Sequence, residues 1–503
     1  MDAPAAKPKT TGKYLVTTAI DYTNDVIHLG HAYQKILADV LARYHRLSGD
    51  KVYFLTGTDE HGQNIEKAAA KNNKTPKQWC DEVSKKDKEQ LDALNISYDR
   101  FIRTTDPDHE ETSLAFYKKV LENGDIYEAS YNGYYCESCE AYKTLSELKD
   151  GHCEFHPSLE LKRVVEKNYF FRWSKYAGFL KEHIKTHPEF IIPPARRNEM
   201  LSFLDGGLED IPVTRQNITW GFPAPNDPRQ IIYVWFDALI NYYTAGKRVG
   251  FWDESTTIIH VLGKDNTRWH TLLWPAMLES ARLRLPNTTI NHSFLTLEGR
   301  KISKTLGNII RPTELTEKYG ADAVRYYLLH FGPLFDDADI SIKRLEEVYN
   351  SDLANNVGNL VSRVAKLAEV AELKVPEDKT ERKFHKSITS ALKDFRVDLA
   401  LTGFFEAKVK KTNEYIDKNK PWKLSQRPDG VGIPTEASGD GEKLNKILTK
   451  LVEDVREIAF NLEPFIPQSA QKIKEQFKGP KIKSGTPLFP RISQISMGDG
   501  ASS

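Results

Sequence analysis

The sequence predicts an α/β protein with a parallel nucleotide-binding sheet, a small metal-binding insertion and an all-α C-terminal region. Three observations lead to this prediction. Strand-like apolar runs alternate with helical patterns on both sides of residues 125–214. That middle segment instead shows short β-like pieces, closely spaced turn residues and a cysteine cluster. From about Asp352 onward strand patterns stop and charged amphipathic helices dominate, which indicates a domain boundary.

The first half of the sheet begins near Lys13. Residues 14–18 form an apolar run typical of a buried strand, and apolar residues at helical spacing follow His31. A second strand over 52–55 leads into the polar residues 56–61. Because ligands bind at the carboxyl ends of parallel strands, we expect these polar groups to border a ligand site.

The insertion carries a metal-ligand pattern. The candidate ligands are Cys136, Cys139, Cys153 and His156, two closely spaced pairs separated by thirteen residues. Two such pairs across a short hairpin make a tetrahedral four-ligand site, so we predict one structural zinc ion. A knuckle with reduced cysteines and no metal stays open as the alternative. We expect the fourth cysteine, Cys80, to be a buried structural residue.

The α/β pattern resumes after residue 215. The apolar runs 231–235 and 258–262 predict the third and fourth strands of the sheet, and the second run leads into Gly263, Lys264 and Asp265. The expected divisions are a first half of the catalytic domain at 1–124, the insertion at 125–214, the second half at 215–297, a lysine-loop region at 298–350 and the helical domain at 351–503.

Two short sequence motifs contain residue types that can bind the phosphates of ATP. His28 and His31, with Gly30 between them, stand at a helix N-terminus, where backbone N–H groups and the macrodipole favour an anion. The loop lysines Lys301 and Lys304 supply cations that can close over a triphosphate. Each word alone is a weak signal. In this order, about 270 residues apart, they resemble the two signature motifs of the class I aminoacyl-tRNA synthetases.

The words around and between these signatures resemble the methionyl-tRNA synthetase family in particular. They run from near Lys13 to about Pro467, almost the whole chain. The matching words are 17–20 with Tyr22 and Asn24, 57–62, Arg215 with 220–221, 233–238, 263–265 with His270, 274–276 and 299–308. The resemblance implies a Rossmann-like catalytic domain that is split by the insertion and followed by a helical bundle.

The resemblance also implies a two-step reaction of methionine, ATP and tRNA(Met). Methionyl-adenylate and pyrophosphate form first, and the aminoacyl group then passes to the 3′-terminal adenosine of the tRNA. The implied catalytic residues are His28, His31, Lys301 and Lys304. The implied ATP-binding residues are Gly30, Gly263, Asp265, Lys301 and Lys304. Mg²⁺ is expected to accompany ATP.

The implied methionine pocket surrounds a polarizable thioether. Its residues are Ala19, Ile20, Tyr22, Asp59, Trp235, Ala238, Leu239, Tyr242 and His270. Asp59 would hold the substrate ammonium group; the alternative for the aromatic residues is a purely structural role in the core. Asn266 departs from the aliphatic residue common in the family, which puts one pocket wall in doubt. Ile302 and Thr305 replace the usual methionine and serine of the lysine signature.

In the helical region Asn359 and Arg363 share one helix face. Trp422 lies in a word that resembles the family's other anticodon contact. These residue types can hydrogen-bond and stack on unpaired bases, and the resemblance implies that they read a CAU anticodon. An ordinary amphipathic helix with a buried tryptophan is the alternative.

Composition sets the remaining limits. The chain has 503 residues, 40% of them hydrophobic and 28% charged, which suits several domains. The formal net charge of +1 gives no global basic signal, so a nucleic acid would have to be bound by local patches. Four cysteines do not make a secreted disulfide framework, no apolar run is long enough to span a membrane, and the N-terminus does not read as a signal peptide. We expect a cytoplasmic monomer without a membrane segment.

Three other functions remain open at this point. A cysteinyl-type synthetase shares both signatures but uses zinc inside its amino-acid pocket. A tRNA-binding protein with a decayed catalytic site is disfavoured by the intact histidines and lysines. An adenylyltransferase that never binds RNA is disfavoured by the long helical region.

Overall fold

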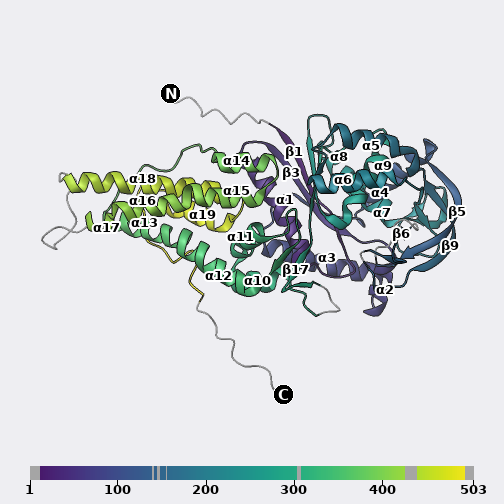
Figure 1. Cartoon of the computed structure of the whole chain (residues 1–503), viewed down its shortest axis with the longest axis horizontal. Coiled ribbons are helices and arrows are strands. Elements are labelled where there is room, and N and C mark those ends of the chain that lie inside the picture. Colours follow the sequence, from purple (N-terminus) through teal and green to yellow (C-terminus); the bar gives the residue numbers. More distant parts are fainter. Residues whose placement is uncertain are drawn as a thin grey trace, which may run out of the picture. The chain divides into compact units, whose positions relative to one another are not determined.

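The computed structural model describes residues 12–138, 141–143, 148–154, 156–302, 307–424 and 439–492. The chain divides into two compact units (Figure 1). Unit 1 comprises Met1–Asp92 and Ile96–Phe294, and unit 2 comprises Ala93–Asn95 and Leu295–Ser503. Among the described residues, no helix has the length and apolar character needed to cross a membrane.

A seven-stranded parallel sheet forms the centre of unit 1. The strand order is β10-β16-β15-β1-β3-β2, and β4 also pairs with β3. The strands are β1 (Lys13–Thr18), β2 (Asp21–Tyr22), β3 (Lys51–Asp59), β4 (Arg100–Arg103), β10 (Ile191–Ile192), β15 (Thr257–Gly263) and β16 (Thr288–His292). The sheet is Rossmann-like, as the sequence predicts.

Helices cover this sheet, and α1 lies against β1, β3 and β15 (Figure 1). The α-helices are α1 (Leu29–Leu47), α2 (Gln63–Lys71), α3 (Pro76–Ala93), α4 (Pro107–Glu122), α5 (Ala177–Thr186), α6 (Pro194–Asp205), α7 (Val234–Ala238), α8 (Asn241–Arg248) and α9 (Trp274–Ser280). The described residues of the unit also form the 3₁₀-helices η2 (Trp173–Tyr176) and η3 (Lys264–Asn266) and the π-helix η4 (Trp269–Leu273). A large apolar cluster in unit 1 includes side chains from α4, α7, η4 and α9.

Smaller antiparallel sheets are formed by segments that lie, in the sequence, between strands of the parallel sheet. Four strands pair in the order β11-β9-β5-β6, three in the order β12-β14-β13, and β7 pairs with β8. Their bounds are β5 (Ile126–Cys136), β6 (Ala141–Lys143), β7 (Leu148–Lys149), β8 (His152–Cys153), β9 (Lys162–Phe171), β11 (Ile211–Pro212), β12 (Thr214–Arg215), β13 (Pro223–Ala224) and β14 (Asp227–Ile232).

The prediction that residues 231–235 form a strand of the nucleotide-binding sheet is wrong. The chain leaves β14 at Ile232, Tyr233 caps α7, and β14 pairs antiparallel with β12 and β13. A short continuous apolar run is equally compatible with a buried strand and a buried helix, so periodicity cannot separate the two. The prediction for 258–262 is confirmed by β15.

Unit 2 is mainly helical, and α18 packs against α13, α16 and α19 (Figure 1). Its helices are α10 (Pro312–Tyr319), α11 (Ala321–Phe331), α12 (Ile342–Val348), α13 (Asn359–Val370), α14 (Lys386–Lys393), α15 (Val397–Phe404), α16 (Lys411–Asn419), α17 (Pro421–Leu424), α18 (Gly439–Leu462) and α19 (Pro467–Gln476), with π-helices η5 (Tyr349–Gly358) and η6 (Phe405–Lys410). A small sheet of β17 (Leu295–Leu297), β18 (Arg300–Lys301) and β19 (Ala338–Ile340) precedes most of them.

Candidate active site

The N-terminus of α1 fixes both histidines of the first signature. His28 is the N-cap, and its Nδ1 accepts a hydrogen bond from the Gly30 N–H at 3.1 Å. His31 Nδ1 accepts from the His28 N–H at 3.2 Å. A ring nitrogen that accepts a hydrogen bond carries no proton, so in each neutral imidazole the proton is on Nε2. Both rings therefore present an Nε2–H donor at the positive end of a helix.

The packing of these rings favours glycine at position 30. The two imidazole centroids are 4.1 Å apart. A Cβ at position 30 would lie 3.0 Å from His28 Cε1 and 3.2 Å from His28 Nδ1. A side chain at position 30 would therefore crowd the His28 ring, which would have to shift by a few tenths of an ångström.

Two buried polar side chains fasten α1 to the carboxyl ends of the strands. Gln34 Nε2 donates to the carbonyls of Ala19 at 3.0 Å and Val261 at 2.9 Å. Lys35 Nζ is fully buried, donates to the Ala19 carbonyl at 3.2 Å and pairs with Asp21 at 2.6 Å. Sequence reasoning missed both residues, because glutamine and lysine on a helix usually face solvent.

Two predicted methionine-site residues meet at the end of β3. Tyr22 and Asp59 are register partners in the parallel β2–β3 pair. The Thr23 N–H donates to the Asp59 carbonyl at 3.0 Å, which holds the β2 segment in place. Asp59 is buried, whereas Tyr22 is half-buried.

Tyr242 and His270 form a buried hydrogen-bonded pair in which the proton positions are determined. His270 Nδ1 donates to the Asn266 carbonyl at 3.0 Å, because a carbonyl can only accept. His270 Nε2 therefore accepts from the Tyr242 hydroxyl at 2.7 Å. Burial lowers the pKa of His270 to about 4, so the pair is uncharged near neutral pH. Since the bond uses the backbone of residue 266, the unusual asparagine does not disrupt it.

Stacked indoles adjoin this pair. The Trp235 ring stacks on Trp269 with centroids 4.7 Å apart, and Trp173 stacks on the same ring at 6.5 Å. Two other predicted pocket residues, Ala238 and Leu239, are buried at the end of α7. The sequence predicts a site role for Trp235 but not for Trp173 or Trp269.

A second group that sequence reasoning missed surrounds Asp237. Its Oδ2 lies 2.8 Å from His61 Nδ1, and its Oδ1 accepts from His109 Nε2 at 3.1 Å and from Ser113 Oγ at 2.7 Å. Burial alone would raise the pKa of Asp237, but the His109 and His61 imidazoles outweigh it and hold the pKa below its usual range. These contacts connect α7 to the polar residues that follow β3. In the sequence, His61 and Asp237 both lie in motifs that resemble the family, and this could have pointed to the group.

Two of the predicted ATP-binding residues lie at the end of β15. Gly263 closes that strand, and Asp265 follows in η3 with an exposed side chain. A Cβ at position 263 would lie 2.7 Å from Asp265 Oδ1. Glycine therefore leaves room for the carboxylate to turn back over the strand end.

The lysine signature belongs to unit 2. Lys301 ends β18, which pairs with β17, and Ile302 is buried. Lys304 and Thr305 lie outside the described residues.

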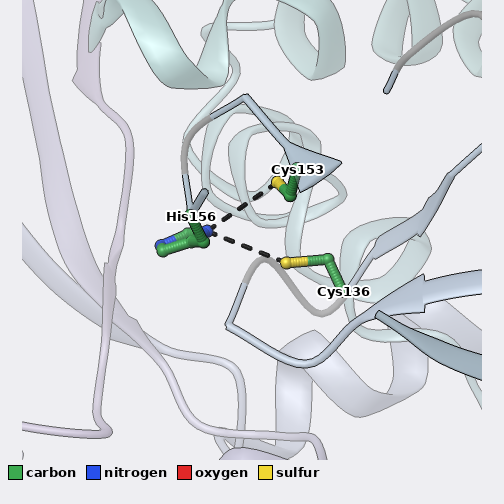
Figure 2. Close-up of side chains that lie close together, drawn as sticks. All are labelled: Cys136, Cys153 and His156. Atoms are coloured by element: carbon green, nitrogen blue, oxygen red, sulfur yellow. Dashed lines mark hydrogen bonds between the residues drawn. The ribbon is translucent and has the colours of Figure 1, made fainter. Parts of the chain in front are cut away.

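Three of the four predicted metal ligands converge (Figure 2). His156 Nδ1 lies 3.8 Å from Cys136 Sγ and 4.0 Å from Cys153 Sγ. Two thiolates and an imidazole are zinc ligands, and bonds of about 2.0–2.3 Å to one ion bring ligand atoms to similar separations. The fourth predicted ligand, Cys139, lies outside the described residues. Cys80 is buried, as predicted, and burial raises its pKa to about 12.

Two of the three predicted anticodon residues meet in unit 2. The Arg363 guanidinium lies over the Trp422 ring, 5.2 Å from its centroid, and pairs with Asp417 at 2.7 Å. Trp422 is 36% exposed, so its indole is accessible for stacking. Asn359 is exposed at the start of α13.

Comparisons with known proteins decide the family. Residues 14–157 and 143–365 match the model described as tRNA synthetases class I (M). The methionine–tRNA ligase of Thermosynechococcus vestitus is 39% identical over 502 residues, which cover 95% of this chain and 92% of that relative. This chain belongs to the methionyl-tRNA synthetase family. The corresponding ligase of Caldanaerobacter subterraneus is 37% identical and covers 95% of this chain, with 79% of its own length matched.

Solved structures of the family share the fold. A Mycobacterium tuberculosis methionyl-tRNA synthetase in complex with methionyl-adenylate superposes with a TM-score of 0.85 at 34% identity, covering 96% of this chain and 100% of that one. The apo form of the same enzyme gives a TM-score of 0.77 at 31% identity, covering 96% and 99%. The predicted family and fold class are confirmed, and the cysteinyl and adenylyltransferase alternatives lose their support.

Proposed function

We propose that this chain activates methionine with ATP and then transfers it to tRNA, and that the site residues of unit 1 perform the first step. A methionine carboxylate oxygen attacks the α-phosphorus of ATP, the bond from that phosphorus to the bridging oxygen breaks, and pyrophosphate leaves. No enzyme nucleophile is needed. The chain's residues therefore act by positioning the reactants and stabilising negative charge.

The orientation of His28 and His31 is the observation that carries this proposal. Both rings have an accepting Nδ1 and a donating Nε2 at the N-terminus of α1. Such donors suit phosphate oxygens whose charge increases as the bond breaks. We assign Lys301 and Lys304 to the departing pyrophosphate. Mg²⁺ bound with ATP would neutralise part of the same charge.

We place the bound methionine beside these histidines and lysines. Asp59 holds the ammonium group, while Ala19, Ile20 and Tyr22 contact the substrate from the β1–β2 side. The buried Tyr242–His270 pair and Trp235 face the thioether, with Ala238 and Leu239 filling the remaining wall. The neutrality of His270 supports this assignment, because a charged group would disfavour an apolar side chain.

We assign a structural zinc ion to Cys136, Cys139, Cys153 and His156. The convergence of the three described ligands supports it. When bound, zinc would cross-link β5, β8 and the following turn, a segment with few apolar residues of its own.

The tRNA partner is assigned to the helical region. The Arg363–Trp422 pair offers a cation and an exposed indole to an unpaired base, and Asn359 offers an amide, so we propose that α13 and α17 read CAU. The division at 1–124, 125–214, 215–297, 298–350 and 351–503, the cytoplasmic location and the monomeric state stay predictions.

ATP–pyrophosphate exchange with each amino acid tests the first step. We expect exchange with methionine alone, and a loss of about a hundredfold in kcat for His28→Ala and for Lys304→Ala, as for other removed charge-stabilising donors. His183→Ala, a histidine of α5 outside the site, is the matched control. Absence of exchange with every amino acid would contradict the proposal.

A further inference from the structure

His292 is a buried polar residue to which neither the family signatures nor the sequence analysis gives a role. It is the last residue of β16 and the register partner of Gly263. Its side chain is 7% exposed and meets the Tyr33 ring edge-on, with centroids 5.3 Å apart. Tyr33 lies on α1, one turn after Gly30. The ring is thus next to one predicted nucleotide-binding residue, Gly263, and touches a tyrosine one turn along the helix from another, Gly30.

The protonation of this ring is determined by one hydrogen bond. His292 Nδ1 lies 2.8 Å from the carbonyl of Ser293, which can only accept, so Nδ1 carries the proton. Burial lowers the pKa of His292 to about 4, so the ring is neutral near pH 7. Nε2 is then an acceptor, and among the described residues it has no hydrogen-bond partner. A buried acceptor without a partner is unfavourable, which points to a donor supplied by a ligand.

Gly263 shows where that donor would come from. A Cβ on Gly263 would lie 3.7 Å from both Cε1 and Nε2 of His292, and 2.7 Å from Asp265 Oδ1. His292 Nε2 and Asp265 Oδ1 therefore both lie within 4 Å of the position that a Cβ on Gly263 would occupy. These two neighbouring acceptors, an imidazole nitrogen and a carboxylate oxygen, suit a ligand that carries two neighbouring hydroxyl donors.

We propose that His292 binds the ribose of ATP: Nε2 accepts a hydrogen bond from one ribose hydroxyl while the Asp265 carboxylate accepts from the other. This inference rests on the proposed function, since it takes ATP as the nucleotide. It makes His292 a substrate-binding residue that distinguishes ATP from the deoxy analogue lacking the hydroxyl it binds.

The test measures KM for ATP, 2′-deoxy-ATP and 3′-deoxy-ATP in methionine-dependent exchange. His292→Phe keeps a ring against Tyr33 but removes the acceptor, so KM for ATP should rise about tenfold, as expected for one lost hydrogen bond. In this variant, KM for the deoxy analogue that lacks the hydroxyl bound by His292 should stay within about twofold of its wild-type value. The substitution and the missing hydroxyl remove the same hydrogen bond. His292→Gln, whose amide oxygen can accept, should restore part of the loss. KM for methionine should not change.

Other outcomes overturn the inference. An equal rise of KM for all three nucleotides in His292→Phe would mean a structural role, and the matched control His183→Phe should leave all three unchanged. Should His292→Phe not fold, His292→Met replaces it. Equal KM values for ATP and both deoxy analogues in the wild type would refute the inference without any variant. Absence of exchange in the wild type would instead contradict the proposed function.

Discussion

Two pairs of imidazoles in unit 1 have opposite hydrogen-bond polarity. His28 and His31 accept at Nδ1, so each presents an Nε2–H donor. His270 and His292 donate from Nδ1 to backbone carbonyls, so each presents an accepting Nε2. Donors suit phosphate oxygens, and acceptors suit hydroxyl groups. The backbone groups beside each ring thus decide what that ring can bind.

Tyr242→Phe removes the hydroxyl that donates to His270. His270 Nε2 is then a buried acceptor without its donor, and the ring loses the contact that orients it. We expect KM for methionine to rise about tenfold while KM for ATP changes little, measured by ATP–pyrophosphate exchange.

Tyr243→Phe is the matched control, since the neighbouring tyrosine packs on Phe116 and Trp252 and is half-buried. It should leave both constants unchanged. A Tyr242→Phe enzyme with wild-type KM for methionine would show that the pair lies away from the substrate.

At this scale the sequence allows prediction of where residues in short motifs lie, such as His28 at the start of a helix and Asp59 at the end of a strand. It does not allow prediction of residues whose role depends on burial. Lys35 and His292 have ordinary residue types for a helix and a strand end, and only the tertiary structure shows that their polar atoms are enclosed. Asn266 illustrates the converse, because its contribution is a backbone carbonyl that any residue supplies.

The sequence predicts the helices and strands whose hydrophobic residues recur with a clear period. It does not predict those that lack such a period. The helical spacing of α1 and the apolar runs of β1 and β15 identify them. The two-residue strand β10 has too few residues for a period, yet it pairs with β16 in the main sheet. It lies inside the range 125–214, so that segment is not wholly separate from the sheet.

The metal knuckle is an element whose stability should depend on zinc. We expect about one zinc ion per chain in the wild type, measured by elemental analysis, and loss of zinc with a lower thermal midpoint in Cys153→Ser. KM for methionine should remain unchanged, because a structural ion does not enter the amino-acid pocket.

Cys80→Ser is the control for that experiment. Cys80 is buried on α3 and is not part of the Cys136, Cys153 and His156 group, so this variant should keep its zinc. Wild-type chain purified with zinc present and found to contain none would mean that the knuckle works without metal.

The Arg363–Trp422 pair should matter for tRNA alone. Trp422→Ala removes the indole under the guanidinium, so we expect kcat/KM for charging a CAU tRNA to fall about tenfold or more, as for one lost base stack. Methionine-dependent exchange should be unaffected. Leu399→Ala, an exposed apolar residue on α15 of the same unit, is the control. Equal charging by both variants would exclude Trp422 from the interface.

For the whole molecule, histidines with lowered pKa values link stability to pH. Burial lowers the pKa of His183, His270 and His292 to about 4. An unfolded histidine has a pKa of about 6.5. Between about pH 6.5 and 4 the unfolded chain therefore binds protons that the folded chain does not, so the free energy of unfolding falls as pH is lowered through this window.

Thermal unfolding midpoints from pH 7 to 4 measure this effect. We expect the midpoint to fall with pH, and His183→Gln, a change outside the site, to weaken the dependence. A midpoint that is constant or rises between pH 6.5 and 4.5 would show that these rings titrate normally in the folded chain.

Charging of tRNA tests the central claim most directly. The purified chain is given ATP, radiolabelled methionine and either a tRNA with the anticodon CAU or the same tRNA with that anticodon replaced. We predict methionine esterified to the CAU tRNA and much slower charging of the altered one, with equal ATP–pyrophosphate exchange in both reactions. Exchange without any charging of the CAU tRNA would contradict the assignment of this chain as a methionine–tRNA ligase.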